Sequence, residues 1–294
     1  MGGPVATLVI ITHEFDRFFV RRVESGPMVS PYLLFDLIEP MQAMGHTVRI
    51  VRGPKAPGGD AALYHVDSTI AQQEYLALAN QYPRTINFRT GDISKRKISR
   101  LLLSKGDGWD GPVIVKADFN NRAIIETLHN RRASIRNLPP PHPGVNRSAN
   151  YRVLDSIAEV GDELWSDPSL VVEKFVAEPD EHGYALRTWV FMGSRERCTR
   201  LVTADKISKA ADVLKYDPVE VPEQLRAERE RLGFDFGKFD FVMHEGEPIL
   251  LDANRTPGIA QAIRPMLRKG ALNLAQGLHE LVTGEAVPAR RPTA

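Results

Sequence analysis

Near its C-terminus the chain reads Lys238-Phe-Asp-Phe-Val-Met-His-Glu-Gly-Glu-Pro-Ile-Leu-Leu-Asp-Ala-Asn-Arg-Thr-Pro-Gly258, and this stretch says most about the fold. Two apolar runs flank the turn residues His244-Glu-Gly-Glu247, a pattern that predicts two antiparallel strands joined by a hairpin turn. Each run contains an aspartate, Asp240 in the first and Asp252 in the second, although Asp is poorly suited to strand interiors. With a three-residue loop, Asp240 lies directly opposite Asp252, and Asn254 falls on the same face.

Two opposed carboxylates need a positive charge between them, because each otherwise disfavours ionisation of the other. Oxygen atoms from Asp240, Asp252 and Asn254 are the ligands that Mg²⁺ prefers, and this ion completes its shell with water and phosphate oxygens. A hairpin whose acids simply face solvent is the alternative, but the apolar flanks argue against it. The stretch therefore predicts a metal site that serves a nucleotide.

The composition is that of an ordinary globular chain. Its 294 residues are 43% hydrophobic and 26% charged, which allows two or three cores. The formal net charge of +1 indicates neither a nucleic-acid partner nor an acidic one. The single cysteine, Cys198, excludes an internal disulfide framework and fits a reducing compartment. The sequence shows no signal peptide and no apolar run approaching ~18 residues, so we expect a cytoplasmic protein without membrane contact.

Alternating strand and helix patterns predict a first α/β unit over residues 1–90. Residues 5–12 form a continuous apolar run, which is typical of a buried parallel strand. No G-x-G-x-x-G follows this strand, which argues against dinucleotide binding. The other predicted elements of this small Rossmann-like domain are strands over 47–51, 63–66 and 85–88 and helices over 30–44 and 70–80.

Two further units follow. Residues 91–172 combine a basic helix, a strand over 113–116, a helix over 123–131 and an exposed Pro-rich connector over 139–144. Residues 173–294 are dominated by antiparallel strands, which include the hairpin, and end with a helix over 272–282. The whole chain is therefore predicted to mix α/β and α+β architecture.

Three basic residues and one crossover segment add to the candidate chemistry. Lys116 ends an apolar strand, where a lysine either extends to water or meets an anion. Arg187 lies on an apolar strand face and needs a partner, either an acid in a structural ion pair or a phosphate. Lys238 shares a face with the first aspartate of the hairpin and can offset the acids or contact a phosphate. Glu173 closes a strand where the chain passes between units, a common place for a small-molecule cleft, or else it faces water.

The sequence resembles the ATP-grasp superfamily in the order of these positions: Lys116, then Glu173-Lys-Phe-Val176, then Arg187, then Lys238-x-Asp-Phe…Leu-Asp-x-Asn-x-x-Pro-Gly258. The nearest comparison is with its carboxylate–amine ligases, such as D-alanine–D-alanine ligase and glutathione synthetase. The resemblance covers residues 90–265. It implies an N-terminal pre-ATP-grasp domain, a central lid subdomain over 91–172 and a C-terminal subdomain, 173–294, that carries the metal site.

The resemblance also implies a role for each position. Asp240, Asp252 and Asn254 are implied as ligands of a Mg²⁺ ion, with Mn²⁺ as the alternative, that bridges the phosphates of ATP. Lys116 and Arg187 are implied as catalytic, the lysine reaching the phosphates and the arginine meeting the γ-phosphate or an acyl phosphate. The implied nucleotide-binding residues are Lys97 (with Lys95 and Arg96 as competitors), Lys116, Glu173 and the backbone of Lys174, Phe175 and Val176 for adenine, Asp180 or Glu181 for ribose, and Lys238.

The sequence departs from the family in three places. Asp118-Phe-Asn-Asn-Arg122 replaces the glycine-rich loop that closes over the phosphates, Asp252 stands where Glu is commoner, and the central unit is short. The implied activity is ATP-dependent ligation, in which a carboxylate activated as an acyl phosphate is attacked by an amine or a related nucleophile. A small-molecule kinase or phosphotransferase and an ATP-binding protein without turnover are the alternatives.

The implied substrates are small-molecule or short-peptide carboxylates and amines, whose identities stay open, and a homodimer is compatible with the sequence. Four residues near strand ends are candidates for acceptor specificity, with ordinary surface charge as the other interpretation of each: His13, Glu14, Arg17 and Arg264.

Overall fold

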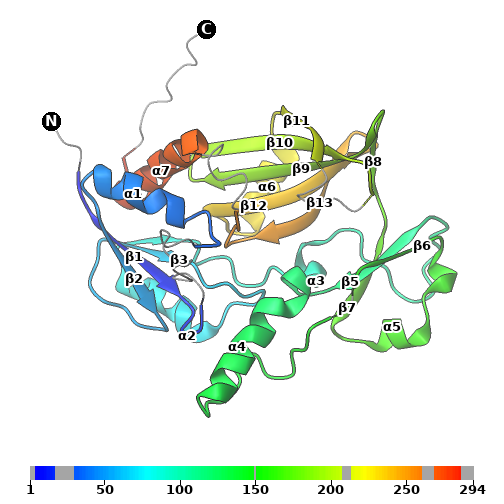
Figure 1. The fold of residues 1–294 in the computed structure, drawn as a ribbon, viewed down its shortest axis with the longest axis horizontal. Helices are drawn as coiled ribbons and strands as arrows, with labels where there is room; N and C mark the ends of the chain where they lie inside the picture. Colours follow the sequence, from blue (N-terminus) through cyan, green and yellow to red (C-terminus); the bar gives the residue numbers. More distant parts are fainter. Residues whose placement is uncertain (1–3, 17–29, 149, 207–212, 260–267, 286–294) are drawn as a thin grey trace, which may run out of the picture.

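The computed structural model describes residues 4–16, 30–148, 150–206, 213–259 and 268–285. The described residues form three sheets, which Figure 1 shows as an N-terminal α/β layer, a small sheet at the lower right (β5, β6 and β7) and a large C-terminal sheet above them. None of the helices in the described residues combines the length and the apolar character that a membrane crossing needs.

The first sheet is parallel, with strand order β2-β1-β3-β4. Its strands are β1 (Thr7–Thr12), β2 (Thr47–Arg52), β3 (Ala61–Tyr64) and β4 (Arg84–Ile86). Residues 8–11 of β1 are fully buried, because apolar clusters cover both faces of the sheet. The helices of this unit are α1 (Phe35–Ala43), α2 (Gln73–Leu76) and the 3-10 helix η1 (Ala77–Gln81). The predicted buried parallel strand over residues 5–12 is thus confirmed, starting at Thr7.

The second sheet is small and antiparallel, with β5 between β6 and β7. Its strands are β5 (Val113–Ala117), β6 (Arg152–Leu154) and β7 (Leu170–Lys174). The helices near it are α3 (Lys95–Ile98), η2 (Asn120–Ala123), α4 (Ile124–Ile135), η3 (Ile157–Glu159) and α5 (Asp162–Ser166). The basic helix predicted after residue 91 is only the single turn of α3. The boundary predicted at residue 172 falls inside β7, which pairs with β5.

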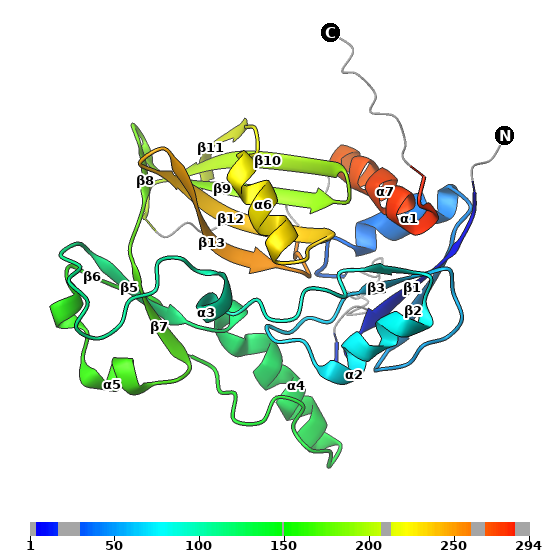
Figure 2. The same cartoon turned by 180° about the vertical axis from the view of Figure 1, so that it is seen from behind.

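The third sheet has strand order β11-β10-β9-β12-β13, with β8 also paired to β9. Its strands are β8 (Glu178–Asp180), β9 (Gly183–Met192), β10 (Arg195–Thr203), β11 (Val213–Pro218), β12 (Phe236–His244) and β13 (Glu247–Asn254). The helix α6 (Glu223–Arg231) covers one face of this sheet, as Figure 2 shows. An aromatic cluster lies beneath it, with the rings of Phe191 and Phe239 edge to face at 5.2 Å.

The C-terminal helix α7 (Arg268–Thr283) joins the first and third sheets. Leu274 and Leu278 of α7 belong to the same buried cluster as Leu8 and Leu37 of the N-terminal unit and Phe236 of β12. The apolar face of α7 therefore completes the core that the N-terminal residues begin, which ties the two units together through a large apolar contact.

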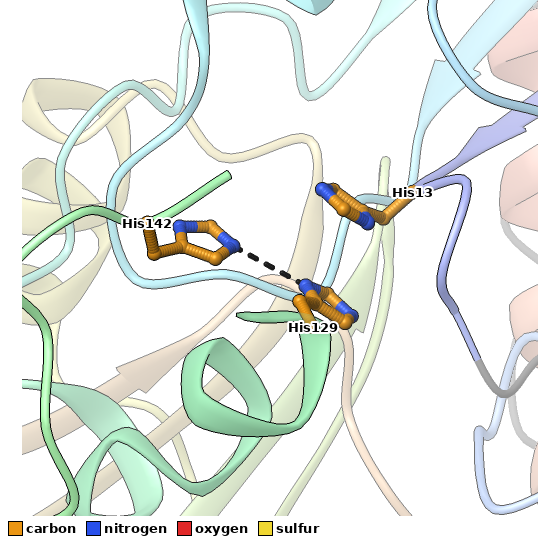
Figure 3. Close-up of side chains that lie close together, drawn as sticks. All are labelled: His13, His129 and His142. Carbon is orange, nitrogen blue, oxygen red and sulfur yellow. Dashed lines mark hydrogen bonds between the residues drawn. The ribbon is translucent and has the colours of Figure 1, made fainter. Parts of the chain in front are cut away.

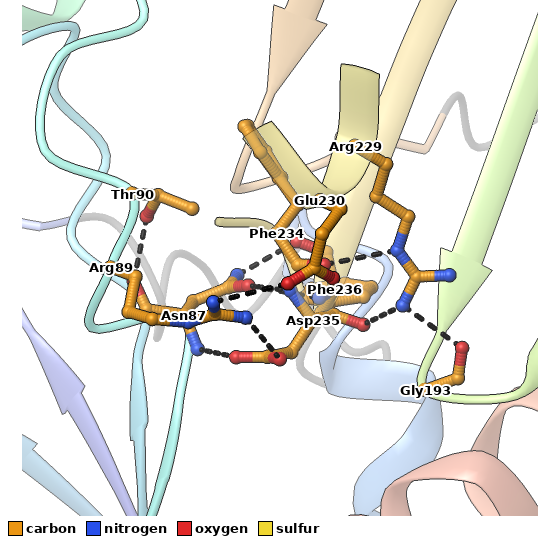
Figure 4. A network of polar contacts seen from close by, with 9 residues as sticks. All are labelled: Asn87, Arg89, Thr90, Gly193, Arg229, Glu230, Phe234, Asp235 and Phe236. Atoms are coloured by element: carbon orange, nitrogen blue, oxygen red, sulfur yellow. Dashed lines mark hydrogen bonds and ion pairs between the residues drawn. The ribbon is translucent and has the colours of Figure 1, made fainter. Parts of the chain in front are cut away.

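A polar junction next to this core fixes the start of β12 to the N-terminal unit. Asn87, whose φ of 65° is left-handed, accepts hydrogen bonds from the backbone N–H groups of Asp235 (2.9 Å) and Phe236 (2.8 Å). Its own amide donates to the Phe236 carbonyl at 2.8 Å. Arg229 of α6 caps the other side by donating to the backbone carbonyl of Gly193 at 2.9 Å (Figure 4). The orientation of the hairpin relative to the first sheet is thus set by satisfied, largely buried hydrogen bonds.

The hairpin has the predicted register but not the predicted loop. Asp240 pairs with Asp252, and Lys238 pairs with Asn254. The loop has two residues, Glu245 and Gly246, both with positive φ, rather than three. A bulge between Asp240 and the next residue of β12 inserts one extra residue in β13 and restores the register.

Candidate active site

The polar face of the β12–β13 hairpin is the centre of the candidate site. Opposite residues and residues two apart share a face of a strand pair, so Lys238, Asp240, Asp252 and Asn254 lie on one face. Residues on the other face, including Phe239, are fully buried in the aromatic cluster. The geometric expectation for the three oxygen-bearing side chains is therefore met by the strand pairing.

Lysines supply the positive charge that the opposed aspartates require. Lys238 pairs with Asp240, Nζ to Oδ2 at 2.6 Å, and Lys95 of α3 pairs with Asp252, Nζ to Oδ1 at 2.5 Å. Burial acts to raise the pKa of Asp252, but Lys95, Lys238 and Lys116 outweigh it and hold that pKa below its usual range. Burial acts to lower the pKa of Lys95, but Asp252 raises it above its ordinary value. The carboxylate is ionised and faces a cluster of ammonium groups.

The remaining polar atoms of the hairpin are positioned by neighbouring elements. Thr188 of β9 donates from Oγ1 to Asp240 Oδ1 at 2.8 Å. Thr256 donates from its backbone N–H to Asn254 Oδ1 at 2.9 Å. Carboxylate and amide oxygens in this arrangement fit a hard divalent cation such as Mg²⁺. Lys95 is bonded to one of the two Asp252 carboxylate oxygens. A cation can therefore bind both oxygens of Asp252 only if Lys95 moves away.

Lys116 and Glu173 form a buried ion pair on the small sheet that faces the hairpin. Lys116 Nζ lies 2.8 Å from Glu173 Oε2, and the side chains are only 8% and 1% exposed. Lys116 also donates to the Leu251 carbonyl of β13 at 3.4 Å, so it reaches the strand that carries Asp252. Glu173 Oε1 is buried and lacks a hydrogen-bond partner within the described part of the chain. A free buried acceptor of this kind suits a donor group on a ligand.

The crossover after Glu173 is already hydrogen-bonded within the protein. The backbone N–H of Lys174 donates to Leu101 O, and that of Phe175 donates to Pro112 O, both at 2.9 Å. The Lys174 ammonium lies over the Trp109 ring, 4.7 Å from its centroid. Val176 is buried in a small apolar cluster. Adenine recognition by this segment stays a prediction, and the N–H groups of Lys174 and Phe175 are committed elsewhere.

The structure places the other predicted residues away from the hairpin face or against internal partners. Arg187 is held by Glu178 at 2.8 Å, which is the ion-pair alternative for this arginine. Asp180 pairs with Arg200 at 2.9 Å. The two remaining side chains, Lys97 and Glu181, are exposed. Their roles toward a nucleotide stay predictions.

Lys95, rather than Lys97, is the lysine of α3 that enters the site. Its side chain is 3% exposed and donates to Asn120 Oδ1 as well as to Asp252. A signal was present in the sequence, because Lys95 stands three residues before the apolar Ile98, and residues at this spacing share a helix face. Ile98 is buried, so its neighbour on that face points inward too.

The loop that replaces the glycine-rich segment takes a strained conformation. Asn121, Arg122 and Ala123 all have left-handed backbones, with φ of 47°, 58° and 57°. Asn accepts this region better than most residues, whereas Arg and Ala adopt it at a cost of about 1–2 kcal/mol each. Asn120 secures the loop by donating from Nδ2 to the Ala253 carbonyl of β13 at 2.8 Å. Strain of this kind is concentrated at ligand-binding sites.

A cavity of about 350 Å³ lies beside the hairpin and is bounded by all three units. Asp252 and Asn254 form one wall, and acids from the other units, Asp67 and Glu126, form another. Glu126 Oε1 accepts from the backbone and hydroxyl of Thr69, whereas its Oε2 is buried and has no partner in the portion of the chain described. Burial raises the pKa of Glu126. Asp67 and Glu126 were not predicted, because nothing in their local sequence marks residues that converge only through long-range contacts.

Two of the acceptor-specificity candidates, Arg17 and Arg264, lie outside the described residues. Glu14 is exposed. His13 is 1% exposed, so the interpretation of this residue as an ordinary surface group is wrong.

No protein-family model matches the sequence, and no curated protein matches it. Solved structures do. The D-alanine–D-alanine ligase of Bacillus anthracis complexed with ATP is similar over 96% of this chain and 97% of its own, at 12% identity and a TM-score of 0.50. The ATP-grasp ligase PsnB complexed with minimal precursor is similar over 94% and 97%, at 11% identity and a TM-score of 0.53. The macrocyclase MdnC of Microcystis aeruginosa MRC bound with precursor peptide MdnA is similar over 93% and 99%, at 12% identity and a TM-score of 0.51.

The chain has an ATP-grasp fold. The fold-level resemblance predicted from the order of Lys116, Glu173, Arg187 and the hairpin is thereby confirmed. At these low identities the likeness concerns the fold, so the activity has to be argued from the side chains.

Proposed function

We propose that this protein is an ATP- and Mg²⁺-dependent ligase that activates a carboxylate as an acyl phosphate for attack by an amine or a related nucleophile. The observation that carries the proposal is the hairpin face, where oxygen atoms of Asp240, Asp252 and Asn254 lie among the ammonium groups of Lys95 and Lys238. Oxygen ligands suit Mg²⁺, and ammonium groups suit phosphate oxygens, so the combination suits a metal–nucleotide complex.

Each residue of the site has a defined task in this proposal. Asp240, Asp252 and Asn254 hold Mg²⁺ (or Mn²⁺), which neutralises charge on the phosphates when it is bound. Lys116 turns from Glu173 toward the phosphates. Glu173 Oε1, a buried acceptor with no partner among the described residues, accepts a hydrogen bond from the adenine. No protein nucleophile is needed, because the work is positioning and charge neutralisation.

The remaining assignments follow the resemblance. Arg187 exchanges Glu178 for the γ-phosphate or the acyl phosphate, and Lys238 contacts the phosphates next to Asp240. We further assign residues 1–90 as the Rossmann-like domain that precedes the ATP-grasp fold, 91–172 as the lid and 173–294 as the metal-bearing subdomain. Three groups of residues complete the nucleotide site: Lys97, Lys174 to Val176 for adenine, and Asp180 or Glu181 for ribose.

The acidic cavity suits the amine substrate. The carboxylates of Asp67, Glu126 and Asp252 line it, and such a lining attracts a protonated amine. Two similar structures, PsnB with a minimal precursor and MdnC with a precursor peptide, support a peptide as one of the substrates. A short peptide with a reactive carboxylate and an amine-bearing group is therefore the first substrate class to test.

A second candidate is an ATP-binding protein without turnover. The observations that favour it are the loop 118–122, which lacks glycine, and the bond from Lys95 to Asp252, which competes with a cation. ADP release distinguishes these candidates from each other and from a small-molecule kinase. A ligase consumes ATP only when both co-substrates are present, whereas a kinase needs only one acceptor. A non-catalytic protein binds ATP without releasing ADP.

A thermal-shift titration followed by an ADP-release assay tests the proposal. ATP at ~100 times its Kd adds about 2.7 kcal/mol of stability, so ATP with Mg²⁺ is expected to raise Tm by several degrees. Asn254→Ala is expected to lose most of this shift. Asp217→Ala, which alters a partly exposed acid on β11 paired with Lys215, is expected to keep it. An undiminished shift in Asn254→Ala would remove the metal assignment. ADP release that needs an added carboxylate and an added amine together identifies the ligase.

A further inference from the structure

Three histidines meet outside the candidate nucleotide site. His13 follows β1, His129 lies in α4, and His142 lies in the Pro-rich connector of residues 139–144 (Figure 3). Each offers one ring nitrogen, and these three atoms all lie within 4.8 Å of one another. The side chains are 1%, 1% and 8% exposed. We propose that these histidines form a binding site for one divalent transition-metal ion of the zinc class.

Two of the nitrogens already have the separation that such an ion requires. His129 Nδ1 and His142 Nε2 are 3.2 Å apart. Ligands at ~2.0–2.1 Å in a tetrahedral zinc site are about 3.3–3.4 Å from one another. The His13 ring stacks on His129 with centroids 3.9 Å apart and planes 5° from parallel. The lone pairs of parallel rings do not converge, so one of these two rings must rotate for both to bind the same ion.

The connector is held in place at the histidine it contributes. Asn130, next to His129 on α4, donates from Nδ2 to the His142 carbonyl at 2.7 Å and accepts from the His142 N–H at 2.9 Å. Gln72 donates to the Pro141 carbonyl at 3.0 Å, which ties the same segment to the N-terminal unit. These bonds fix the backbone of the connector at His142, which limits the positions that the His142 ring can take.

The chemistry of the ligand set selects the class of ion. The grouped ligand atoms are all imidazole nitrogens. Three imidazoles suit Zn²⁺, Co²⁺, Ni²⁺ or Cu²⁺, whereas Mg²⁺ prefers oxygen. The site is thus chemically distinct from the hairpin.

Metal uptake carries two internal costs. His129 Nδ1 and His142 Nε2 share a hydrogen bond, so the proton between them must move before both nitrogens can bind an ion. The second cost is at His13. Its Nδ1 accepts a hydrogen bond from the Phe15 backbone N–H at 3.1 Å, which places the proton of the neutral ring on Nε2. Coordination through Nδ1 replaces that hydrogen bond, and coordination through Nε2 requires the ring proton to move. Either change reduces the affinity relative to a site whose lone pairs are all free.

A bound ion would fasten the N-terminal unit to the lid. His13 directly follows β1 of the first sheet, whereas α4 follows directly on η2, whose Asn120 contacts the hairpin. The ion would therefore fix α4, and with it the loop of residues 118–122, relative to the N-terminal sheet.

The test uses the full-length chain after removal of metal with EDTA. We expect Co²⁺ to bind with one equivalent per chain and to give the intense visible absorption of a four-coordinate nitrogen site, and Zn²⁺ to displace it. His129→Asn and His142→Gln are each expected to weaken Zn²⁺ binding at least ~10-fold in competition with a chromophoric chelator. His182→Gln, which alters an exposed histidine in the turn between β8 and β9, is the matched control and should bind as the wild type does.

Several results would overturn the site. The first is a wild-type protein that takes up no Co²⁺ or Zn²⁺ at micromolar concentration. The second is a weakly absorbing Co²⁺ spectrum, typical of six-coordinate Co²⁺. The third is an affinity for Zn²⁺ that is the same in both histidine variants as in the wild type. The metal-free Tm of each variant shows whether it is folded, and the wild-type Co²⁺ spectrum decides the question without any variant. Asp252→Ala should retain Zn²⁺ binding, so failure of the nucleotide proposal and failure of this site are distinguishable.

Discussion

Removing one partner of the Lys116–Glu173 pair is expected to destabilise the protein strongly. The atoms Nζ and Oε2 are 2.8 Å apart, and the two side chains are 8% and 1% exposed. Lys116→Met leaves a buried carboxylate whose other oxygen also lacks a partner within the described residues. Loss of one partner from such a pair costs about 3–5 kcal/mol, a large part of the roughly 5–15 kcal/mol that stabilises a typical protein.

A double-mutant cycle separates this effect from simple loss of packing. Lys116→Met and Glu173→Leu are measured singly and together by calorimetry without ligands. Each single variant is expected to lower Tm by about 10 °C, at roughly 2–4 °C per kcal/mol for a chain of this order of size. The double variant removes both charges, so its cost is expected to fall well below the sum, with a coupling of about 3 kcal/mol.

Two outcomes would refute this reasoning. One is a cost below about 1 kcal/mol for each single variant, which is the value of a solvent-exposed pair. The other is a double variant whose cost equals the sum of the single costs, which would mean that the two charges do not interact.

Three further predictions concern stability. Burial lowers the pKa of His13 and His65 to about 3 and that of His142 to about 4, so below pH 6.5 the unfolded chain binds protons that the folded chain does not. The free energy of unfolding therefore decreases as the pH is lowered, by about 4 kcal/mol between pH 7 and 5.5. A Tm that does not change over this pH range, measured without divalent metal, would contradict this. Gly277→Ala should cost about 1–3 kcal/mol in chemical denaturation, because the new Cβ would lie 2.1 Å from a carbonyl of β9. Asn87→Ala should lower stability by about 3 kcal/mol through lost hydrogen bonds and left-handed strain, and an unchanged Tm would show that the junction is dispensable.

The hairpin shows how far local sequence determines a site. Alternating apolar residues fix which side chains share a face, so the pairing of Asp240 with Asp252 could be predicted. The loop could not, because a two-residue turn with a bulge and a three-residue loop give the same register. The bulge is visible only when the two strands are seen side by side.

Long-range convergence explains what the sequence did not reveal. Asp67, Glu126 and Asp252 come from three units and meet at one cavity, and no local period records that meeting. The strands β6, β8 and β11 were not predicted either; β6 and β8 are three residues each and carry too little pattern. Lys95 was named only as a competitor of Lys97, although its spacing to Ile98 could have identified it as inward-facing.

The shared core of α7 and the N-terminal sheet has a consequence for biosynthesis. Leu8 and Ile10 pack with Leu37 of α1 and with Leu274 and Leu278 of α7, so one side of the first sheet stays only partly covered until α7 has been translated. From the end of β4 at residue 86 to Val282 the ribosome adds 196 residues (282 − 86), which takes roughly 10–40 s at ~5–20 residues per second. During that interval the nascent chain exposes apolar surface, and binding by a chaperone would keep it from aggregating.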